Sequence, residues 1–264
     1  MNKTLRAIPD EFPASWASEW GQERMGENRE WSFWMAFSYK GARQCFRWIE
    51  PGQFLMGSPP GEAGRDDDEQ QHQVTLSQGF WLADTACSQA LWQAVMGGNT
   101  SQFKGKDRPV DSVSWNDVQT FLTKLNGLQP ELQLCLPSEA QWEYACRAGT
   151  ATAYSFGEAI RTEQVNCSGR NTLPVKSLPP NAWGLYQMHG NVWEWCRDGY
   201  AAYPQGPVTD PVGPEADSRV LRGGSWNVFA WFCRSAVRFR DRAGGSDLNC
   251  GFRLSRGPTA GRSG

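Results

Sequence analysis

The stretch from residue 149 to the C-terminus constrains the fold most, because its turn-forming residues recur too often for long helices or strands. Glycine, proline and asparagine stand at short intervals, and no apolar residues repeat with a helical period. Such a segment would normally suggest disorder, yet it holds several tryptophans, which a disordered chain lacks. The whole chain has 14 Trp and 28 Gly among 264 residues. These features predict an ordered, loop-rich structure held by large aromatic side chains and buried arginine–carboxylate pairs.

Three short helices are expected between residues 88 and 147. The first covers Ser88 to Met96 and ends at Gly97-Gly98. The second begins at a capping box, SWND (114–117), and ends at Gly127, and the third begins at the capping box SEAQ (138–141). Each has one apolar stripe, so all three should pack on a shared core.

Strand-like segments surround these helices in the sequence. Phe46 to Met56 and Gln73 to Leu82 flank a loop rich in Pro, Gly and Asp, and the alternating aromatic residues before position 40 resemble an added β segment. We expect an N-terminal β extension over 1–44 packed on the main domain, a main domain over 45–255 and a disordered tail over 256–264. The expected class is α+β, with few short helices packed around small antiparallel sheets.

Composition excludes several functions. Charged residues of both signs are spread along the chain and the formal net charge is −2, so neither nucleic acid nor an anionic membrane is an expected partner. No apolar run approaches the roughly 20 residues of a membrane span, and the N-terminus lacks an apolar signal core, so the expected location is cytoplasmic. The eight cysteines contain no CxxC, and there are only two histidines, which indicates neither a zinc site nor a disulfide framework.

Six sequence blocks carry a family resemblance. In order they are FLMGS (54–58), DRPVDSVSW (107–115), LPSEAQWEYACRAG (136–149), NAWGLYQMHGNVWEWCRD (181–198), RVLRGGSW (219–226) and GFRL (251–254). Together they resemble the sulfatase-modifying, formylglycine-generating enzyme domain family over residues 45–255. The resemblance implies a variant of the C-type lectin fold with little regular secondary structure.

The enzyme activity of that family implies a copper-binding cysteine pair after the GGS motif. The implied positions lie three and eight residues after Ser225, where this chain has Val228 and Cys233. Two thiolates are needed to hold a cuprous ion in linear geometry, and Val228 offers no ligand atom. Related iron-dependent sulfoxide synthases need a histidine-rich partner domain, which two isolated histidines cannot supply. We therefore expect no catalytic residues and no required cofactor, with Cys233 a packed thiol.

The same segment resembles, more closely, the variable region of proteins diversified by diversity-generating retroelements. The fixed frame is GGSW (223–226), CRSA (233–236), Arg238, Arg240 and GFRL (251–254). Adenine-directed mutagenesis of AAC codons cannot produce Trp, Met, Gln, Lys or Glu, and none of these occurs in the gaps except Trp231, which is assigned to the frame. The candidate variable residues, within the region 227–250, are Asn227, Val228, Phe229, Phe232, Val237, Phe239, Asp241, Ser246, Asp247, Leu248, Asn249 and Cys250.

The expected function is non-catalytic binding of a protein ligand through this variable region. Phe229, Phe232 and Phe239 would be the aromatic anchors. The alternative that the apolar members are core residues is weakened by the neighbouring Asn and Asp side chains, which are costly to bury unpaired. Two other functions stay open, namely a formylglycine-generating oxidase and a catalytically inactive module of that family.

Two smaller signals have competing interpretations. The GNVWEW block resembles part of a structural calcium site, with Gly190, Val192 and Glu194 as ligands; alternatively, Glu194 pairs with a buried arginine such as Arg222. The arginines of the C-terminal segment are expected to form internal ion pairs rather than a nucleic-acid groove. They are Arg234, Arg238, Arg240, Arg242 and Arg253.

Overall fold

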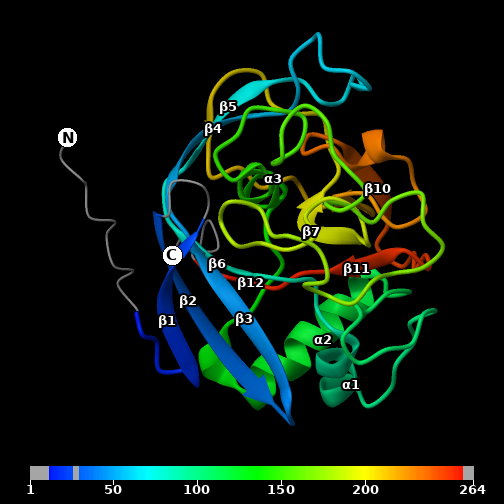
Figure 1. The fold of residues 1–264 in the computed structure, drawn as a ribbon. Coiled ribbons are helices and arrows are strands. Elements are labelled where there is room, and N and C mark those ends of the chain that lie inside the picture. The colour runs from blue at the N-terminus through cyan, green and yellow to red at the C-terminus, as the bar shows by residue number, and fades with distance from the viewer. Residues whose placement is uncertain (1–11, 26–29, 258–264) are drawn as a thin grey trace.

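Three small sheets and a few short helices form the fold in this computed structural model, which describes residues 12–25 and 30–257 (Figure 1). The largest sheet has the order β1-β2-β3-β6-β12 and is antiparallel throughout. Its strands are β1 (Glu19–Met25), β2 (Glu30–Tyr39), β3 (Ala42–Ile49), β6 (Phe80–Ala83) and β12 (Ser255–Arg256).

Two further sheets are mixed. The four-stranded sheet has the order β10-β9-β7-β11, and the three-stranded sheet has the order β4-β5-β8. β11 runs parallel to β7, and β8 runs parallel to β5, because each pair is joined by a long connection rather than a hairpin. The sheets are therefore small as expected but not all antiparallel. Their strands are β4 (Gly52–Met56), β5 (His72–Leu76), β7 (Trp193–Gly199), β8 (Val208–Thr209), β9 (Ser218–Arg222), β10 (Arg238–Arg242) and β11 (Cys250–Phe252).

The three expected helices are confirmed. α1 (Gln89–Met96) is capped by Ser88 and ends at Gly97, whose φ of +85° suits glycine. α2 (Trp115–Leu128) and α3 (Glu139–Arg147) both begin with complete capping boxes. Gly127 lies inside the last turn of α2 rather than beyond it. Two short 3₁₀ helices, η1 (Pro130–Leu132) and η2 (Ala230–Cys233), complete the helical elements of residues 12–25 and 30–257.

Each of the two long strand-like runs is two strands in different sheets. Phe46 to Met56 contains the end of β3 and all of β4, separated by Pro51, which has no N–H to continue a ladder. Gln73 to Leu82 contains most of β5 and the start of β6. The bend between them needs Gly79, since a Cβ there would lie 2.2 Å from the Trp48 ring. Sequence alternation cannot show where a chain leaves one sheet for another.

The described part of the N-terminal segment belongs to the main sheet. β1 pairs with β2, and β2 pairs with β3 across the boundary expected at residue 44, which falls inside β3. Phe33, Met35 and Phe37 are buried in the largest core cluster. At the other end, Arg256 pairs with Trp81 in the β12–β6 ladder, so the expected tail 256–264 does not begin at 256. Residues 1–11 and 258–264 lie outside the described residues.

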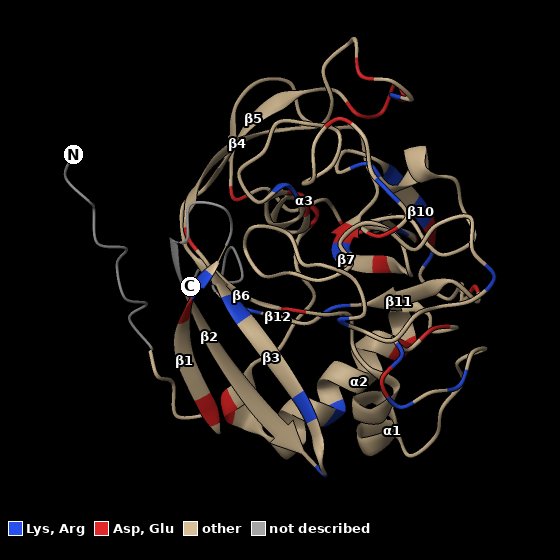
Figure 2. Cartoon of the chain, viewed as in Figure 1, with Lys and Arg blue, Asp and Glu red and all other residues tan. Residues whose placement is uncertain are grey.

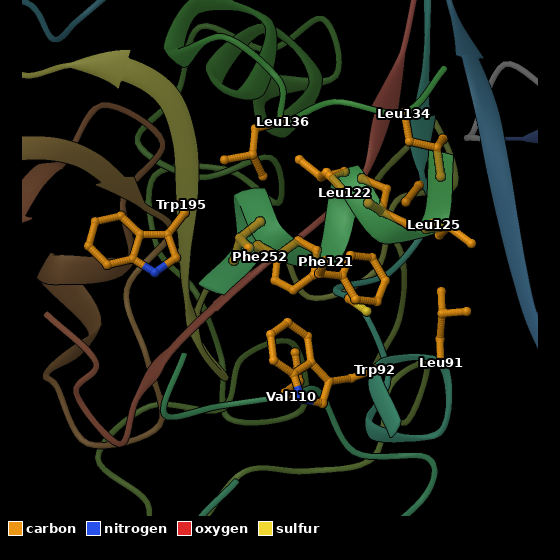
Figure 3. Close-up of a cluster of buried hydrophobic side chains, with 14 of the residues drawn as sticks. Leu91, Trp92, Val110, Phe121, Leu122, Leu125, Leu134, Leu136, Trp195 and Phe252 are labelled. Carbon is orange, nitrogen blue, oxygen red and sulfur yellow. The ribbon is translucent and has the colours of Figure 1, made fainter. Parts of the chain in front are cut away.

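An aromatic core joins the helices to the four-stranded sheet (Figure 3). Phe121 on α2 stacks on Trp92 of α1, with ring centroids 5.3 Å apart, and meets Phe252 of β11 edge-on at 5.4 Å. Trp195 of β7 is fully buried, and its indole N–H donates to the Val113 carbonyl at 2.9 Å. These contacts fix β7 and β11, on which the variable segment depends.

Buried ion pairs hold the loop-rich half, as the composition predicts. Arg222 pairs with Glu143, Arg238 with Glu139 at 2.7 Å, and Arg253 with Glu194 at 2.6 Å. All these side chains are at most 6% exposed. Basic and acidic residues lie close to each other around α3 and β7 (Figure 2). Each buried guanidinium thus has a carboxylate partner, without which its burial would be strongly unfavourable.

Candidate ligand-binding surface

The GGSW motif fixes where the variable segment begins. Gly223 and Gly224 have φ values of +96° and +74°, which favour glycine. A Cβ at Gly223 would lie 2.9 Å from the Trp142 ring, and one at Gly224 would lie 2.5 Å from the Cys233 sulfur. Both positions therefore exclude any side chain, which explains their place in the frame.

Most of the candidate variable residues reach solvent. Phe229 is 57% exposed, Phe239 46%, Leu248 44% and Phe232 41%. Asn227, Ser246 and Asp247 are also exposed, while Val228, Asp241 and Asn249 are partly buried. Exposed phenylalanines are unfavourable for a free surface, so their clustering indicates a contact region.

Two of the twelve candidates, Val237 and Cys250, are buried and are not available to a ligand, which corrects their place among the ligand-binding residues. Val237 is 6% exposed and belongs to the largest core cluster. Cys250 is 1% exposed and pairs with Trp193 in the β11–β7 ladder, and burial raises its pKa well above that of an ordinary thiol. Both lie next to residues of the frame, and both side chains belong to the largest core cluster.

Trp231, which was assigned to the frame, is a member of the exposed surface. It is 48% exposed, and its ring stacks on Phe229 with centroids 4.5 Å apart and an interplanar angle of 20°. Phe232 lies 5.9 Å away on its other side. The codon argument assigns Trp231 to the frame, but it gives no information about exposure. The useful signal was its position between two candidates in a short turn.

The two ends of the variable segment meet. Asn249 donates to Asn227 Oδ1 at 2.9 Å, and Ser225 donates to the same oxygen at 2.7 Å. Phe239 on β10 stacks over Trp193 with centroids 5.1 Å apart, while the Trp193 N–H donates to the Asn249 carbonyl at 2.8 Å. The two ends of the segment are therefore in contact. The candidates that are exposed or partly buried, together with Trp231, are here called the variable face: Asn227, Val228, Phe229, Trp231, Phe232, Phe239, Asp241, Ser246, Asp247, Leu248 and Asn249.

Buried polar contacts support η2 from below. Arg234 pairs with Glu62 and with Glu69, the latter at 2.7 Å, and so anchors the loop over residues 57–70. Glu69 is buried, whereas Asp66 and Asp67 at the tip of this loop are exposed. The Tyr154 hydroxyl donates to the Ala230 carbonyl at 2.9 Å. These contacts thus hold the backbone that carries the aromatic residues of η2.

The residues present do not fit the copper site of the formylglycine-generating enzymes. Val228 is an aliphatic side chain packed against the small cluster that contains Cys233. Cys233 is fully buried, with its pKa raised by a hydrogen bond with Cys167 and by burial. The expectation of a packed Cys233 matches its burial, but this thiol has a cysteine neighbour that sequence spacing gave no reason to expect.

The carboxylate of the expected calcium site is engaged elsewhere. Glu194 Oε2 accepts from the Trp142 indole and from Arg253 Nε, both at 2.6 Å, and Oε1 accepts from Arg253 Nη2 at 2.8 Å. The Gly190 carbonyl accepts from the Val192 N–H at 3.0 Å. In the described part of the chain, no group of three or more His, Cys, Asp or Glu side chains could hold a metal ion. The geometry favours the ion-pair alternative, with Arg253 rather than Arg222 as partner.

Three of the five C-terminal arginines are internal. Arg234, Arg238 and Arg253 are buried in ion pairs, whereas Arg240 and Arg242 are exposed. The Arg240 guanidinium lies over the Tyr200 ring at 4.5 Å. Of the five, only Arg240 and Arg242 therefore reach solvent.

The comparisons with known proteins identify the family. Residues 40–258 match the family described as sulfatase-modifying factor enzyme 1-like domain, and the chain belongs to this family. A formylglycine-generating enzyme of Streptomyces coelicolor is 35% identical over 63% of this chain and 58% of its own length. A serine/threonine-protein kinase pkn1 of Chlamydia caviae is 41% identical over 79% of this chain and 37% of its own length. The chain therefore spans less than two thirds of these relatives.

Among solved structures, Treponema denticola variable protein 1 is similar in both fold and length. It superposes with a TM-score of 0.77 at 28% identity, covering 85% of this chain and 99% of that protein. The expected C-type lectin-type fold and the resemblance to variable proteins are thereby confirmed. Over residues 12–25 and 30–257, the helices are all too short or too polar to cross a membrane.

Proposed function

We propose that this chain is a non-catalytic binding protein that recognises a protein ligand through its variable face, and that a retroelement diversifies the residues of that face. The observation that carries the proposal is the connected set of exposed aromatic side chains around Trp231, built on a frame of buried Gly, Trp and Arg. Similarity to Treponema denticola variable protein 1 supports it.

The structure gives a physical reason why these positions would tolerate replacement. A side chain that projects into solvent can change size or polarity without creating a cavity or burying an unpaired polar group. Phe229 and Phe232 project from a turn whose backbone is held by Tyr154 and Arg234, neither of which depends on the identity of the exposed side chain. Substitution would then alter binding while leaving the fold intact.

Binding is tested with the aromatic cluster and a matched control. The protein ligand would first be recovered from the native host. The triple variant Phe229→Ser, Trp231→Ser, Phe232→Ser should bind it with a Kd at least about 30-fold higher, since truncating a hot-spot aromatic costs about 2 kcal/mol or more. The control Leu55→Ser, Leu128→Ser removes side chains that are 47% and 54% exposed elsewhere. Equal ligand binding by both variants would exclude the variable face as the binding site.

Diversification is tested in the genome that encodes the chain. We expect a reverse transcriptase gene nearby and a repeat of the DNA for residues 227–250 that differs only at adenines. Without such a repeat the diversification proposal fails, although ligand binding by the same face could still be measured. The two parts of the proposal are therefore separable.

A formylglycine-generating oxidase is the second candidate, favoured by the 35% identity to such an enzyme. Its test is conversion of a cysteine-containing sulfatase peptide to the formylglycine product, followed by mass spectrometry. We expect no product, because position 228 supplies no thiolate. Product formation with stoichiometric copper would replace the binding proposal by the enzyme.

The third candidate is a catalytically inactive module of a larger signalling protein, favoured by the similarity to a kinase that is longer than this chain. It would share the variable face but not the adenine-specific repeat. The genomic test above therefore distinguishes it from a diversified binding protein.

A further inference from the structure

Two cysteines from distant parts of the sequence meet below the variable face. Cys167 packs against the small cluster that contains Cys233, and each thiol is the neighbour that most changes the pKa of the other. All eight cysteines are reduced in this structure. Cys233 stands at one of the two implied copper positions, 228 and 233, whereas Cys167 stands at neither, and the pair does not require the proposed ligand binding.

The backbone around the pair holds the two thiols in place. Ser168 N–H donates to the Val228 carbonyl at 2.8 Å, and Gly169 N–H donates to the Trp226 carbonyl at 2.6 Å. These bonds dock the segment that carries Cys167 against the segment that leads to Cys233. Gly224 leaves room for the Cys233 sulfur, since a Cβ there would lie 2.5 Å from that atom.

The two thiols have different surroundings. Cys167 is partly exposed, whereas Cys233 is fully buried. Contact with the Cys233 thiol, helped by Ser168 and opposed by partial burial, lowers the pKa of Cys167 to about 7, while contact with Cys167 and burial raise the pKa of Cys233. Tyr154 also lies near the pair, and burial raises its pKa to about 12, so it stays neutral at physiological pH.

No other cysteine combines these features. Burial raises the pKa of Cys45 and of Cys146 to about 12 and that of Cys135 to about 11. Burial also raises the pKa of the remaining thiols, Cys87, Cys196 and Cys250. An accessible thiolate beside a buried thiol is the arrangement that thiol–disulfide exchange uses.

We propose that Cys167 and Cys233 form a redox-active pair that closes to a disulfide by exchange with a small-molecule disulfide. The Cys167 thiolate attacks one sulfur of the small disulfide, whose S–S bond breaks, and the first small thiolate leaves and takes a proton from water. Cys233 then loses its proton and attacks the Cys167 sulfur, which releases the second small thiolate. One small disulfide is reduced to two thiols, and the cysteine pair loses two electrons and two protons.

Closing the pair would covalently join the end of η2 to residues 166–169. Phe229, Trp231 and Phe232 precede Cys233 directly, so the cross-link would restrict the turn that presents them. Oxidation would thus reduce the conformational freedom of the aromatic cluster without changing any exposed side chain.

The test uses the full chain and oxidised glutathione. Peptide mass spectrometry should show a Cys167–Cys233 disulfide after incubation, and alkylation of Cys167 by iodoacetamide should have a pH midpoint near 7. The Cys233→Ala variant should stop at a mixed disulfide between Cys167 and glutathione, with the midpoint moved toward the ordinary thiol value of about 8.5. Cys135→Ser, at a partly buried cysteine elsewhere, should leave both results unchanged.

Three results would overturn the proposal. The first is an ordinary alkylation midpoint for Cys167 in the unsubstituted chain. The second is a mixed disulfide that persists there with no internal link. The third is that Cys167→Ser consumes as much oxidised glutathione as the unsubstituted chain. The alkylation profile of the unsubstituted chain keeps the proposal testable if Cys233→Ala does not fold.

Discussion

At the scale of single residues, the variable face joins Trp231 to the candidate variable side chains. Trp231 cannot arise from an AAC codon, yet it stacks on Phe229 and also contacts Phe232 in the exposed cluster. Under the diversification proposed above, Trp231 would give every variant of this face one large apolar contact, while its neighbours would change the shape around it. Binding strength and binding specificity can therefore belong to different residues of the same turn.

His189 shows how completely a buried polar residue can be satisfied. Its Nδ1 lies 2.8 Å from the Cys233 carbonyl and must therefore carry the proton, while Nε2 accepts from the Ser155 N–H at 3.1 Å. Burial lowers the pKa of the ring to about 4, with a smaller lowering from Arg147. The neutral ring is the form that fits this site.

This lowered pKa predicts an acid-sensitive contribution to stability. Between pH 6.5 and about 4 the unfolded chain binds a proton at His189 that the folded chain does not, so stability falls as the pH falls through this window. The loss should be on the order of 3 kcal/mol at most. Urea unfolding of the unsubstituted chain and of His189→Gln, each at several pH values, measures it as the difference between the two slopes.

That comparison also removes the opposing effect of Asp198. Burial raises the pKa of this carboxyl to about 6, so its contribution to stability is lost as the pH rises from about 4 to 6. Both chains contain Asp198, and its effect cancels in the difference. Parallel pH profiles for the two chains would show that His189 is protonated equally in the folded and unfolded states.

At the scale of elements, β10 determines which residues of the variable segment are exposed. Arg238 and Arg222 are directly opposite each other in the β10–β9 ladder and share Glu139, at 2.7 and 3.6 Å, on the buried face. Phe239, one residue later, points to the opposite face and lies over Trp193. Since side chains alternate along a strand, the buried Arg238 fixes the exposure of Phe239.

η2 depends in a similar way on Arg234, which joins it to the 57–70 loop. Replacing Arg234 with Met should lower the free energy of unfolding by about 3 to 5 kcal/mol, because the carboxylates of Glu62 and Glu69 would stay buried without a cationic partner. Hydrogen exchange should rise in the loop and in η2 together. The matched control is Arg240→Met, at an exposed arginine nearby.

Adding Glu69→Gln to Arg234→Met tests the cause of that loss. Removing the unpaired charge should restore part of the stability if the buried carboxylate is responsible. A loss no larger than that of Arg240→Met would mean that the ion pair contributes little to holding η2.

At the scale of the whole molecule, the chain is held together by contacts between distant segments. β1 and β2 complete the sheet that continues through β3 and β6 to β12, so the first and last strands of the described chain form the opposite edges of one sheet (Figure 1). The family match begins at residue 40, but Met35 and Phe37 before it are at most 1% exposed. The N-terminal strands therefore supply part of the common core.

We predict that these strands cannot be removed without loss of the fold. Phe37→Ala should destabilise the chain by about 3 to 5 kcal/mol, because it leaves a cavity in the largest core cluster beside Phe46. Trp20→Ala, at a side chain that is 55% exposed, should cost much less. Thermal and urea unfolding of both variants measure the difference, and equal losses would show that the N-terminal strands add little to the core.

Local chemistry in the sequence determined the helices, the frame and the family. Capping boxes at Ser114 and Ser138 predict helix starts because the bonds lie within four residues of each other, and the GGSW and GFRL motifs identify a frame whose glycines have no space for a side chain. The absence of a thiol at position 228 could also be read directly.

Only the tertiary structure decided what depends on partners distant in sequence. It placed Val237 and Cys250 in the core, exposed Trp231, assigned Arg253 to Glu194, and brought Cys167 to Cys233. It also divided each long strand-like run between two sheets. In a chain with so few regular elements, side-chain direction follows from long-range hydrogen bonds and ion pairs, and residue spacing along the sequence carries no record of them.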